Sequence, residues 1–138
     1  MRSFLVTDTT ALFASLDRSD QDHAACAALL GSGRGVLIPP TVLTETVQLA
    51  HRRGLRTAAG ALLGLVLAGE IEVAQIDHED WARIREPVNR YSDLPLDAVA
   101  ASVVALAERL GEEEIVTLAR RHFAVIRPLH TRTFHLVP

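Results

Sequence analysis

The chain has 138 residues, which is enough for one domain with a sizeable core and too few for two. Hydrophobic residues make up 49% of it, which excludes a disordered chain and predicts a single globular domain over residues 1–138. The net charge of −3 argues mildly against a general nucleic-acid binder, although a site built from carboxylates would shift the balance in the same direction.

The first half of the chain alternates β-rich runs with helical patterns. Short runs of β-forming residues predict strands at residues 4–7, 36–38 and 71–74. Apolar residues at helical spacing predict helices at residues 9–16, 23–30, 41–53 and 57–68. Pro39 and Pro40 fit at the start of the third of these helices, because proline is tolerated in a first helical turn.

A further helix is predicted to open at Asp77 or His78. Apolar residues recur at helical spacing from residue 81 to residue 88. Pro87 lies inside this pattern, and we expect it to kink or break the helix just before it.

The next helix has the most distinctive pattern in the chain. It is predicted to run from Pro95 or Leu96 to Leu110. Between residues 98 and 107 only Ser102 is polar. A helix that is apolar on nearly every side is packed inside a protein, so we expect this one to be buried.

Short β-rich runs close the chain. Strands are predicted at residues 115–117 and from 123 to 126, with a short helical turn between them. Residues 133–137 form either a final short strand or a packed tail. The alternation of strands and helices predicts an α/β fold of three layers, α/β/α, with a central parallel sheet covered on both faces.

Two acidic residues are candidate metal ligands at the edge of this sheet. Asp8 ends the first strand, and Glu45 lies at the margin of the apolar side of the third helix. A hard cation such as Mg²⁺ prefers oxygen ligands, and it activates water and neutralises phosphate charge in nucleases. The carboxyl ends of parallel strands are where such acids would meet. Two ordinary explanations stay open, because Asp8 also suits a helix cap and Glu45 a solvated helix position.

Other chemistries find little support in the sequence. The six histidines show no zinc-like spacing, Cys26 is the single cysteine, and no activated serine or cysteine nucleophile is evident. The longest apolar run, residues 58–69, is shorter than the roughly 17–25 residues of a membrane span. The start of the chain lacks the features of a signal peptide, so a cytoplasmic protein that does not enter a membrane is expected.

Basic residues form two clusters, at residues 51–56 and at residues 120–122. The ordinary explanation for each is a helix end whose positive side chains complement the helix dipole.

The segments DLPL, ASVVALAERLG and TLARRHF resemble the C-terminal half of PIN-domain proteins of the VapC toxin type. In that family the corresponding pattern reads DLPLGxxDAS and later TLDRRHF. The resemblance implies a PIN-like fold over essentially the whole chain. It also implies an endoribonuclease that uses Mg²⁺ or Mn²⁺, forms a homodimer and pairs with a small antitoxin protein. The basic tail of such an antitoxin occludes the acidic cleft, and contact with it is expected on the helices around residues 41–67.

The resemblance also assigns the candidate site residues. Asp8 and Glu45 fall at metal-binding positions, and Asp93 of the DLPL loop is either an acid beside the site or a helix cap. Ala100 and Ala119 fall where the family carries two metal-binding aspartates.

The two alanines imply weak or absent metal binding and impaired catalysis. Asp97, three residues before Ala100, either reaches toward the vacant position or complements the dipole of the buried helix. Two origins fit the alanines: natural loss of the acids, or deliberate Asp→Ala changes that spare the expression host from an active ribonuclease. The alternative function is a non-catalytic module that binds an antitoxin-like partner or RNA.

Overall fold

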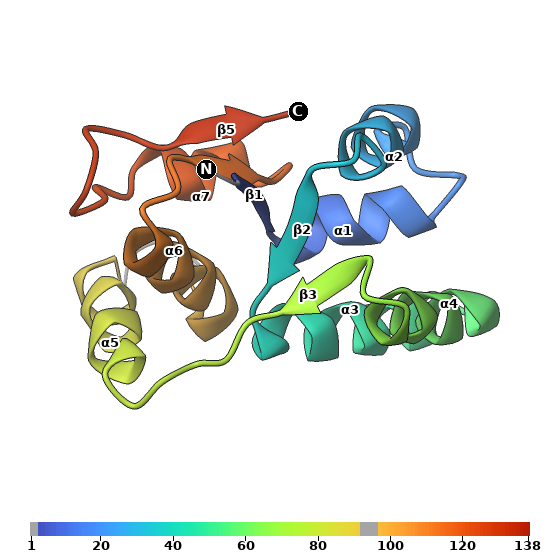
Figure 1. The fold of residues 1–138 in the computed structure, drawn as a ribbon, viewed down its shortest axis with the longest axis horizontal. Coiled ribbons are helices and arrows are strands. Elements are labelled where there is room, and N and C mark those ends of the chain that lie inside the picture. The colour runs from blue at the N-terminus through green and yellow to red at the C-terminus, as the bar shows by residue number, and fades with distance from the viewer. Residues whose placement is uncertain (1–2, 92–96) are drawn as a thin grey trace.

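Five short parallel strands form the centre of the structure, a computed structural model that describes residues 3–91 and 97–138 (Figure 1). Their spatial order is β3-β2-β1-β4-β5, so β1 lies in the middle, and every neighbouring pair is parallel. The strands are β1 (Phe4–Thr7), β2 (Gly35–Ile38), β3 (Ile71–Val73), β4 (Glu114–Val116) and β5 (His135–Val137). The predicted three-layer α/β fold with a parallel sheet is confirmed.

Seven helices in the described part of the chain connect and cover these strands (Figure 1). They are α1 (Thr9–Leu16), α2 (His23–Leu30), α3 (Pro40–Arg52), α4 (Arg56–Leu67), α5 (Asp80–Arg90), α6 (Ala98–Leu110) and α7 (Arg120–Ala124). No helix in residues 3–91 or 97–138 has the length and apolar character needed to cross a bilayer.

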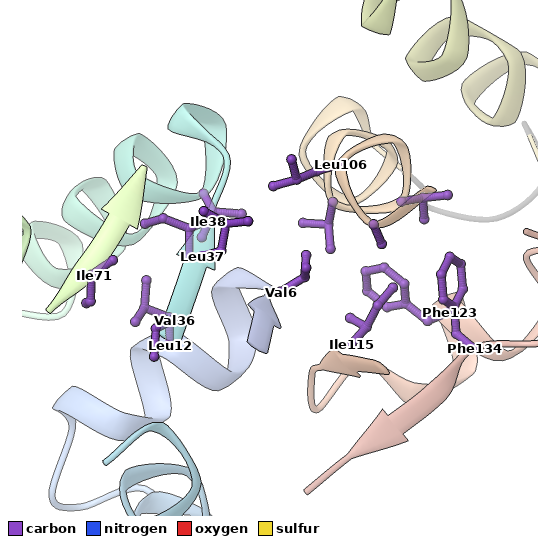
Figure 2. Packing of buried hydrophobic residues seen from close by; sticks show 14 of the residues in the cluster. Val6, Leu12, Val36, Leu37, Ile38, Ile71, Leu106, Ile115, Phe123 and Phe134 are labelled. Atoms are coloured by element: carbon purple, nitrogen blue, oxygen red, sulfur yellow. The ribbon is translucent and has the colours of Figure 1, made fainter. Parts of the chain in front are cut away.

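The central strand is buried on both faces, because successive side chains of a strand point to opposite sides. Leu5 packs in a cluster with Val116 and with residues of α1 and α2. Val6 and Ile115 belong to the main core on the other face, together with residues of α6 (Figure 2). A strand buried on both sides reads as a continuous apolar run, which explains why FLVT shows no alternation.

Helix α6 is as buried as its sequence predicts. Every residue from Ala101 to Ala107 is buried. Gly111 ends the helix with a φ of 68°, a left-handed conformation that suits a residue without a side chain. Ser102 avoids an unpaired hydroxyl in this apolar setting because it donates to the carbonyl of Val99 and lies 2.6 Å from the Thr41 hydroxyl.

Two predictions about elements are wrong. The strand expected at residues 123–126 is not formed, because Phe123 belongs to helix α7. Phe123 and Ile126 are both buried, and their spacing of three residues suits a helical turn. The fifth strand is instead β5, in which Leu136 pairs with Ile115. The break expected at Pro87 is also wrong, since α5 continues to Arg90, Tyr91 N donates to the Pro87 carbonyl at 2.9 Å and packing against α6 supports the whole helix. The kink, which was the other possibility, stays a prediction.

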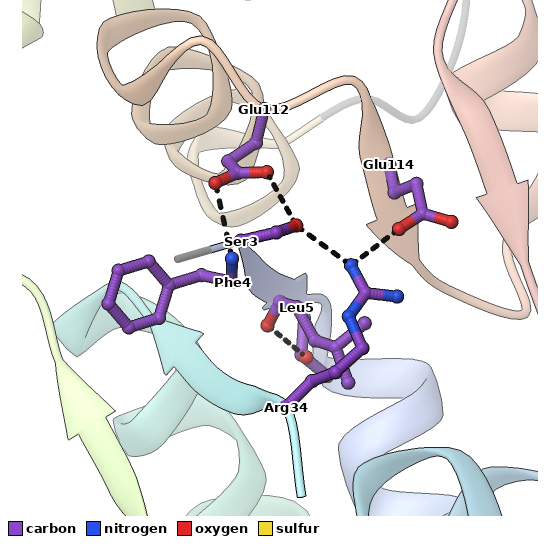
Figure 3. A network of polar contacts seen from close by, with 7 residues as sticks. Ser3, Phe4, Leu5, Arg34, Glu112 and Glu114 are labelled. Atoms are coloured by element: carbon purple, nitrogen blue, oxygen red, sulfur yellow. Dashed lines mark hydrogen bonds and ion pairs between the residues drawn. The ribbon is translucent and has the colours of Figure 1, made fainter. Parts of the chain in front are cut away.

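A polar network ties together the amino ends of β1, β2 and β4 (Figure 3). Glu112 accepts from Phe4 N at 3.2 Å and from the Ser3 hydroxyl at 3.4 Å. Arg34 donates to the same hydroxyl at 3.0 Å and forms an ion pair with Glu114 at 2.6 Å. These contacts fix the edge of the sheet opposite to the carboxyl ends of the strands, where a site is expected.

Helices α5 and α6 share a partly buried ion pair whose loss should be measurable. Arg83 donates to both oxygens of Glu108, at 2.8 and 3.1 Å, and Glu108 also accepts from Leu129 N at 2.7 Å. The Glu108 side chain is only 7% exposed. We expect Glu108→Ala to lower the free energy of unfolding by about 2 kcal/mol, because it leaves the guanidinium and an amide without their acceptor.

Urea denaturation measures this effect, and Glu86→Ala is the matched control. Glu86 pairs with Arg90 on the surface, where the two side chains are 40% and 60% exposed, so its loss should change stability by less than about 0.5 kcal/mol. Equal effects of the two substitutions would contradict the prediction.

Candidate active site

A cavity of about 200 Å³ opens at the carboxyl ends of β1 and β4. Asp8 reaches it from the end of β1, Glu45 from α3 and Asp97 from the start of α6. Ala100 of α6 and Ala119, which precedes α7, also line it. The fold therefore gathers into one cavity three of the four acids considered in the sequence, together with both alanines. Asp93 lies outside the described residues.

Asp8 is held rigidly at the base of this cavity. Its carboxylate oxygen Oδ2 accepts hydrogen bonds from the hydroxyls of Thr10 and Thr117, each at 2.9 Å. The backbone N–H of Asp8 donates to the carbonyl of Val116 at 2.9 Å and so ties the residue to β4. Asp8 is the N-terminal flanking residue of α1, yet its side chain makes no capping bond to that helix. Its carboxylate is instead oriented by one hydroxyl from α1 and one from the residue that follows β4.

Thr10 and Thr117 are site residues that the sequence reasoning missed. Thr10 Oγ1 lies 3.2 Å from Thr117 Oγ1 and accepts from Leu118 N at 2.9 Å. Thr117 Oγ1 accepts from Ala119 N at 2.9 Å, so the same hydroxyls that orient Asp8 also fix the segment before α7. The signal available in the sequence was a threonine directly after the fourth strand, which lies beside the first strand in a parallel sheet.

Burial raises the pKa of the Asp8 carboxyl above its ordinary value, and hydrogen bonds from Thr117 and Thr10 offset part of this rise. The ionised form is therefore less favourable in the folded protein than in the unfolded chain. The stability that comes from the raised pKa is fully present below the unfolded value of 3.8 and is lost as the pH rises through the folded value.

We expect Asp8→Asn to stabilise the protein by about 1 kcal/mol at neutral pH, because the amide keeps an acceptor oxygen without a buried charge. This advantage over the unchanged protein should shrink as the pH falls toward 3.8, and urea denaturation across the pH range measures it. Asp17→Asn is the control of opposite sign, because hydrogen bonds from Ser19 lower the pKa of that exposed carboxyl. A destabilised Asp8→Asn variant at neutral pH would refute the prediction.

Asp97 acts as the cap of α6. Its Oδ1 accepts from the backbone N–H of Ala100 at 3.0 Å, which is the ordinary role expected for an acid at the start of a helix. It lines the cavity as well, but this bond uses one of its two oxygens. Glu45 lies in the second turn of α3, where it lines the cavity and is half-buried.

The donor set in this cavity does not fit a tightly held divalent cation. In residues 3–91 and 97–138, no group of three or more His, Cys, Asp or Glu side chains is arranged to hold a metal ion. One oxygen of Asp8 and one of Asp97 are already engaged, and Ala100 and Ala119 offer no donor. A cation that needs six or more oxygens would rely on Glu45, the remaining carboxylate oxygens and water.

Two further side chains give the cavity hydrogen-bonding groups that are not acidic. Thr9 is 4% exposed, and its hydroxyl finds no hydrogen-bond partner in the described part of the chain. His122, on α7, brings an imidazole to the same cavity. A buried hydroxyl without a partner is unfavourable by about 1–3 kcal/mol, so the cavity is suited to a ligand that supplies that hydrogen bond.

Comparison with known proteins identifies the family of this chain. The sequence pattern of the PIN domain matches residues 5–127, and the chain belongs to the PIN-domain family. Within that family it groups with the VapC ribonucleases, since it is 31% identical over 135 residues to Ribonuclease VapC26 of Mycobacterium tuberculosis. That match covers 97% of this chain and all of the relative.

Solved structures show the same fold at lower sequence identity. VapC20 of Mycobacterium tuberculosis, a toxin that cleaves the sarcin–ricin loop, superposes with a TM-score of 0.80 at 22% identity, over 94% of this chain and 99% of that one. VapBC2 of Rickettsia felis bound to a promoter DNA fragment gives a TM-score of 0.68 at 13% identity, with both chains covered completely.

Proposed function

We propose that this chain is the toxin component of a VapC-type toxin–antitoxin pair, built as a Mg²⁺-dependent endoribonuclease and catalytically impaired in its present sequence. The observation that carries the proposal is the cavity that holds Asp8, Glu45 and Asp97 beside Ala100 and Ala119. The fold assembles the edge where a nuclease needs converging acids, and two positions at that edge carry methyl groups.

The charge of the cavity explains why catalysis should be weak. A divalent cation, where one is bound, supplies an activated water and neutralises the charge of a phosphodiester. The residues present do not fit such a cation tightly. We therefore expect the cavity to bind RNA more readily than it hydrolyses it. Thr9 and His122 offer hydrogen-bonding groups to a phosphodiester, and Asp8 is held in place by Thr10 and Thr117.

The proposal is tested by incubating the protein as it stands with RNA in the presence of Mg²⁺ or Mn²⁺. We expect cleavage no faster than that of an Asp8→Ala variant, which serves as the background for any contaminating ribonuclease. Vigorous cleavage that depends on Asp8 would contradict the proposed impairment and would leave the family assignment intact.

A second candidate, a non-catalytic binding module, is favoured by the outer face of α4. Leu67 is 89% exposed and Leu63 is 43% exposed. Gly60 and Gly64 lie on the same side of the helix, and a side chain built at either would meet nothing within 4 Å. An exposed apolar helix face of this kind is suited to a partner, and it falls within the region where antitoxin contact is predicted.

Relatives of the same fold are known in complexes of toxin and antitoxin. They include VapBC2 of Rickettsia felis and the DNA-bound VapBC of Salmonella typhimurium, which superposes with a TM-score of 0.64 at 19% identity and covers 99% of this chain and 97% of that one. We propose that α4 binds an antitoxin here too. Homodimer formation and a cytoplasmic location stay predictions from the resemblance.

A further inference from the structure

Four exposed arginines belong to two neighbouring segments, the turn between α3 and α4 and the loop between α1 and α2, which line the same hollow. We call this set the arginine corner; its members are Arg18, Arg52, Arg53 and Arg56. None of them forms an ion pair with any residue in the described part of the chain, whereas Arg34, Arg83, Arg90 and Arg109 do. The four arginines outnumber the acids of the same two segments, Asp17, Asp20 and Asp22, by one, in a chain of net charge −3.

The chain turns sharply to bring these residues together. Gly54 has a φ of 73°, Leu55 N donates to the carbonyl of Ala50 at 2.9 Å, and Gly54 N donates to that of His51 at 3.1 Å. This pair of bonds is the Schellman motif, which ends α3 and reverses the direction of the chain within two residues. The Arg53 guanidinium lies 5.7 Å from the centre of the Phe13 ring, which fixes the corner against α1.

The helix dipole explains only part of this cluster. Arg52 and Arg53 stand at the C-terminal end of α3, where positive charge is favourable. Arg56 is the first residue of α4, and a cation at a helix N-terminus is unfavourable. Arg18 comes from a different segment, the loop between α1 and α2. The helix dipole therefore does not explain the positions of Arg18 and Arg56.

A hollow of about 580 Å³ lies beside the corner, between the segment that carries Arg18 and the start of α4. Asp17 is the one acid that lines it, and Ser19 already donates to the carboxylate of Asp17 with its N–H at 3.0 Å and its hydroxyl at 2.7 Å. These bonds lower the pKa of Asp17, and Arg53 adds a smaller effect. Both bonds reach Oδ1, and Asp17 stays a negative charge beside the corner, but none of the four arginines forms an ion pair with it, so the arginines remain available to an external anion.

A groove of about 390 Å³ along α3 leads from the acidic cavity toward this corner. It shares Glu45 and Val99 with the cavity and continues past Thr44 and Gln48. Glu45, Gln48 and Arg52 follow at spacings of three and four, so they lie on one side of the helix. Glu45 and Arg52 are seven residues apart on α3, so the track between them is about 10 Å long, which exceeds the roughly 3.4 Å rise between successive nucleotides of a strand.

We propose that the arginine corner binds the phosphates of an RNA strand whose other part lies in the cavity. This rests on the proposed function and adds where the substrate runs. The charge of the corner favours RNA over the basic tail expected of an antitoxin, which four unpaired arginines would repel. Thr44 and Gln48 present hydroxyl and amide groups to the bases between the two ends, and the arginines hold the backbone without reading sequence.

The test compares two triple variants with the same change of charge. The first is Arg18→Gln, Arg52→Gln and Arg56→Gln, which leaves Arg53 on Phe13. The control is Arg85→Gln, Arg127→Gln and Arg132→Gln, three exposed arginines outside the corner and without ion pairs in the described residues. Binding of single-stranded RNA of about 4 and about 20 nucleotides is measured over a range of salt concentrations.

We expect the corner variant to bind the long RNA at least about tenfold more weakly, with a salt slope smaller by about 2, because each lost phosphate contact removes about 0.7. Binding of the short RNA and binding by the control variant should change little. If the unchanged protein binds RNA and both variants behave alike, the corner is not the site, and the proposed function still stands. If the unchanged protein binds no RNA, both the RNA-binding role of the arginine corner and the proposed ribonuclease function are wrong. If poly-glutamate of matched length displaces the long RNA with equal affinity, the corner serves an acidic protein instead.

Discussion

Ribonuclease activity is expected to rise by at least about 100-fold when both cavity alanines are replaced in the double variant Ala100→Asp and Ala119→Asp. Both residues line the cavity with Asp8 and Glu45, so each new carboxylate would add an oxygen donor to an incomplete set. A metal that contributes several kcal/mol of charge stabilisation corresponds to a rate factor of this size. Cleavage of RNA in Mg²⁺, followed over time, measures the gain.

The matched control is Ala100→Asn with Ala119→Asn, which adds side chains of the same shape without charge. We expect no gain from this variant, and we expect the gain of the double aspartate variant to vanish when Asp8→Asn is added. Activity of the asparagine variant would show that space filling rather than charge was missing. Silence of the aspartate variant, with its fold intact, would favour the non-catalytic binding module.

A second large effect is expected from Phe123→Ala, which should lower the free energy of unfolding by about 3–5 kcal/mol. Phe123 is 1% exposed and packs in the main core beside Ile115 and Phe134 (Figure 2). It also lines the cavity, because it is carried on the short helix that follows Ala119. A five-residue helix has little stability of its own, so this one aromatic anchor holds α7 and the cavity wall in place.

Guanidinium denaturation measures the loss, and Val125→Ala is the control from the same segment. Val125 is 45% exposed, so its truncation should change stability by less than about 1 kcal/mol. Phe123→Leu, which keeps most of the volume, should lie between the two. A loss below about 1 kcal/mol for Phe123→Ala would show that α7 is held by other contacts.

The sequence predicted the layers and the position of the cavity because both follow from patterns of burial. Consecutive apolar residues such as Phe4, Leu5 and Val6 are expected in a strand only when both of its faces are covered, and a helix such as α6 is apolar on nearly every side only when it is enclosed. A parallel sheet then places Asp8 at the edge formed by the carboxyl ends of the strands, whereas the pairing of β1 with β4 is known from the structure.

Other features depended on contacts that no local pattern encodes. Phe123 and Ile126 suit either a strand or a helix in a short apolar run, and the core decided between them. The hydrogen bond from Thr117 to Asp8 joins two residues that are 109 positions apart in the chain. The continuation of α5 through Pro87 likewise reflects packing against α6, which outweighs the loss of one hydrogen bond.

The clasp formed by Arg34, Glu112 and Glu114 has a consequence for how such a protein changes over generations (Figure 3). It anchors three strands at one rim of the sheet, while Asp8, Ala100 and Ala119 stand at the other. Acids at the carboxyl ends of the strands can therefore be replaced by alanine during evolution without loss of the contacts that hold the opposite edge of the sheet together. A protein of this kind can keep its fold after its catalytic activity is lost, and the fold can then serve another function.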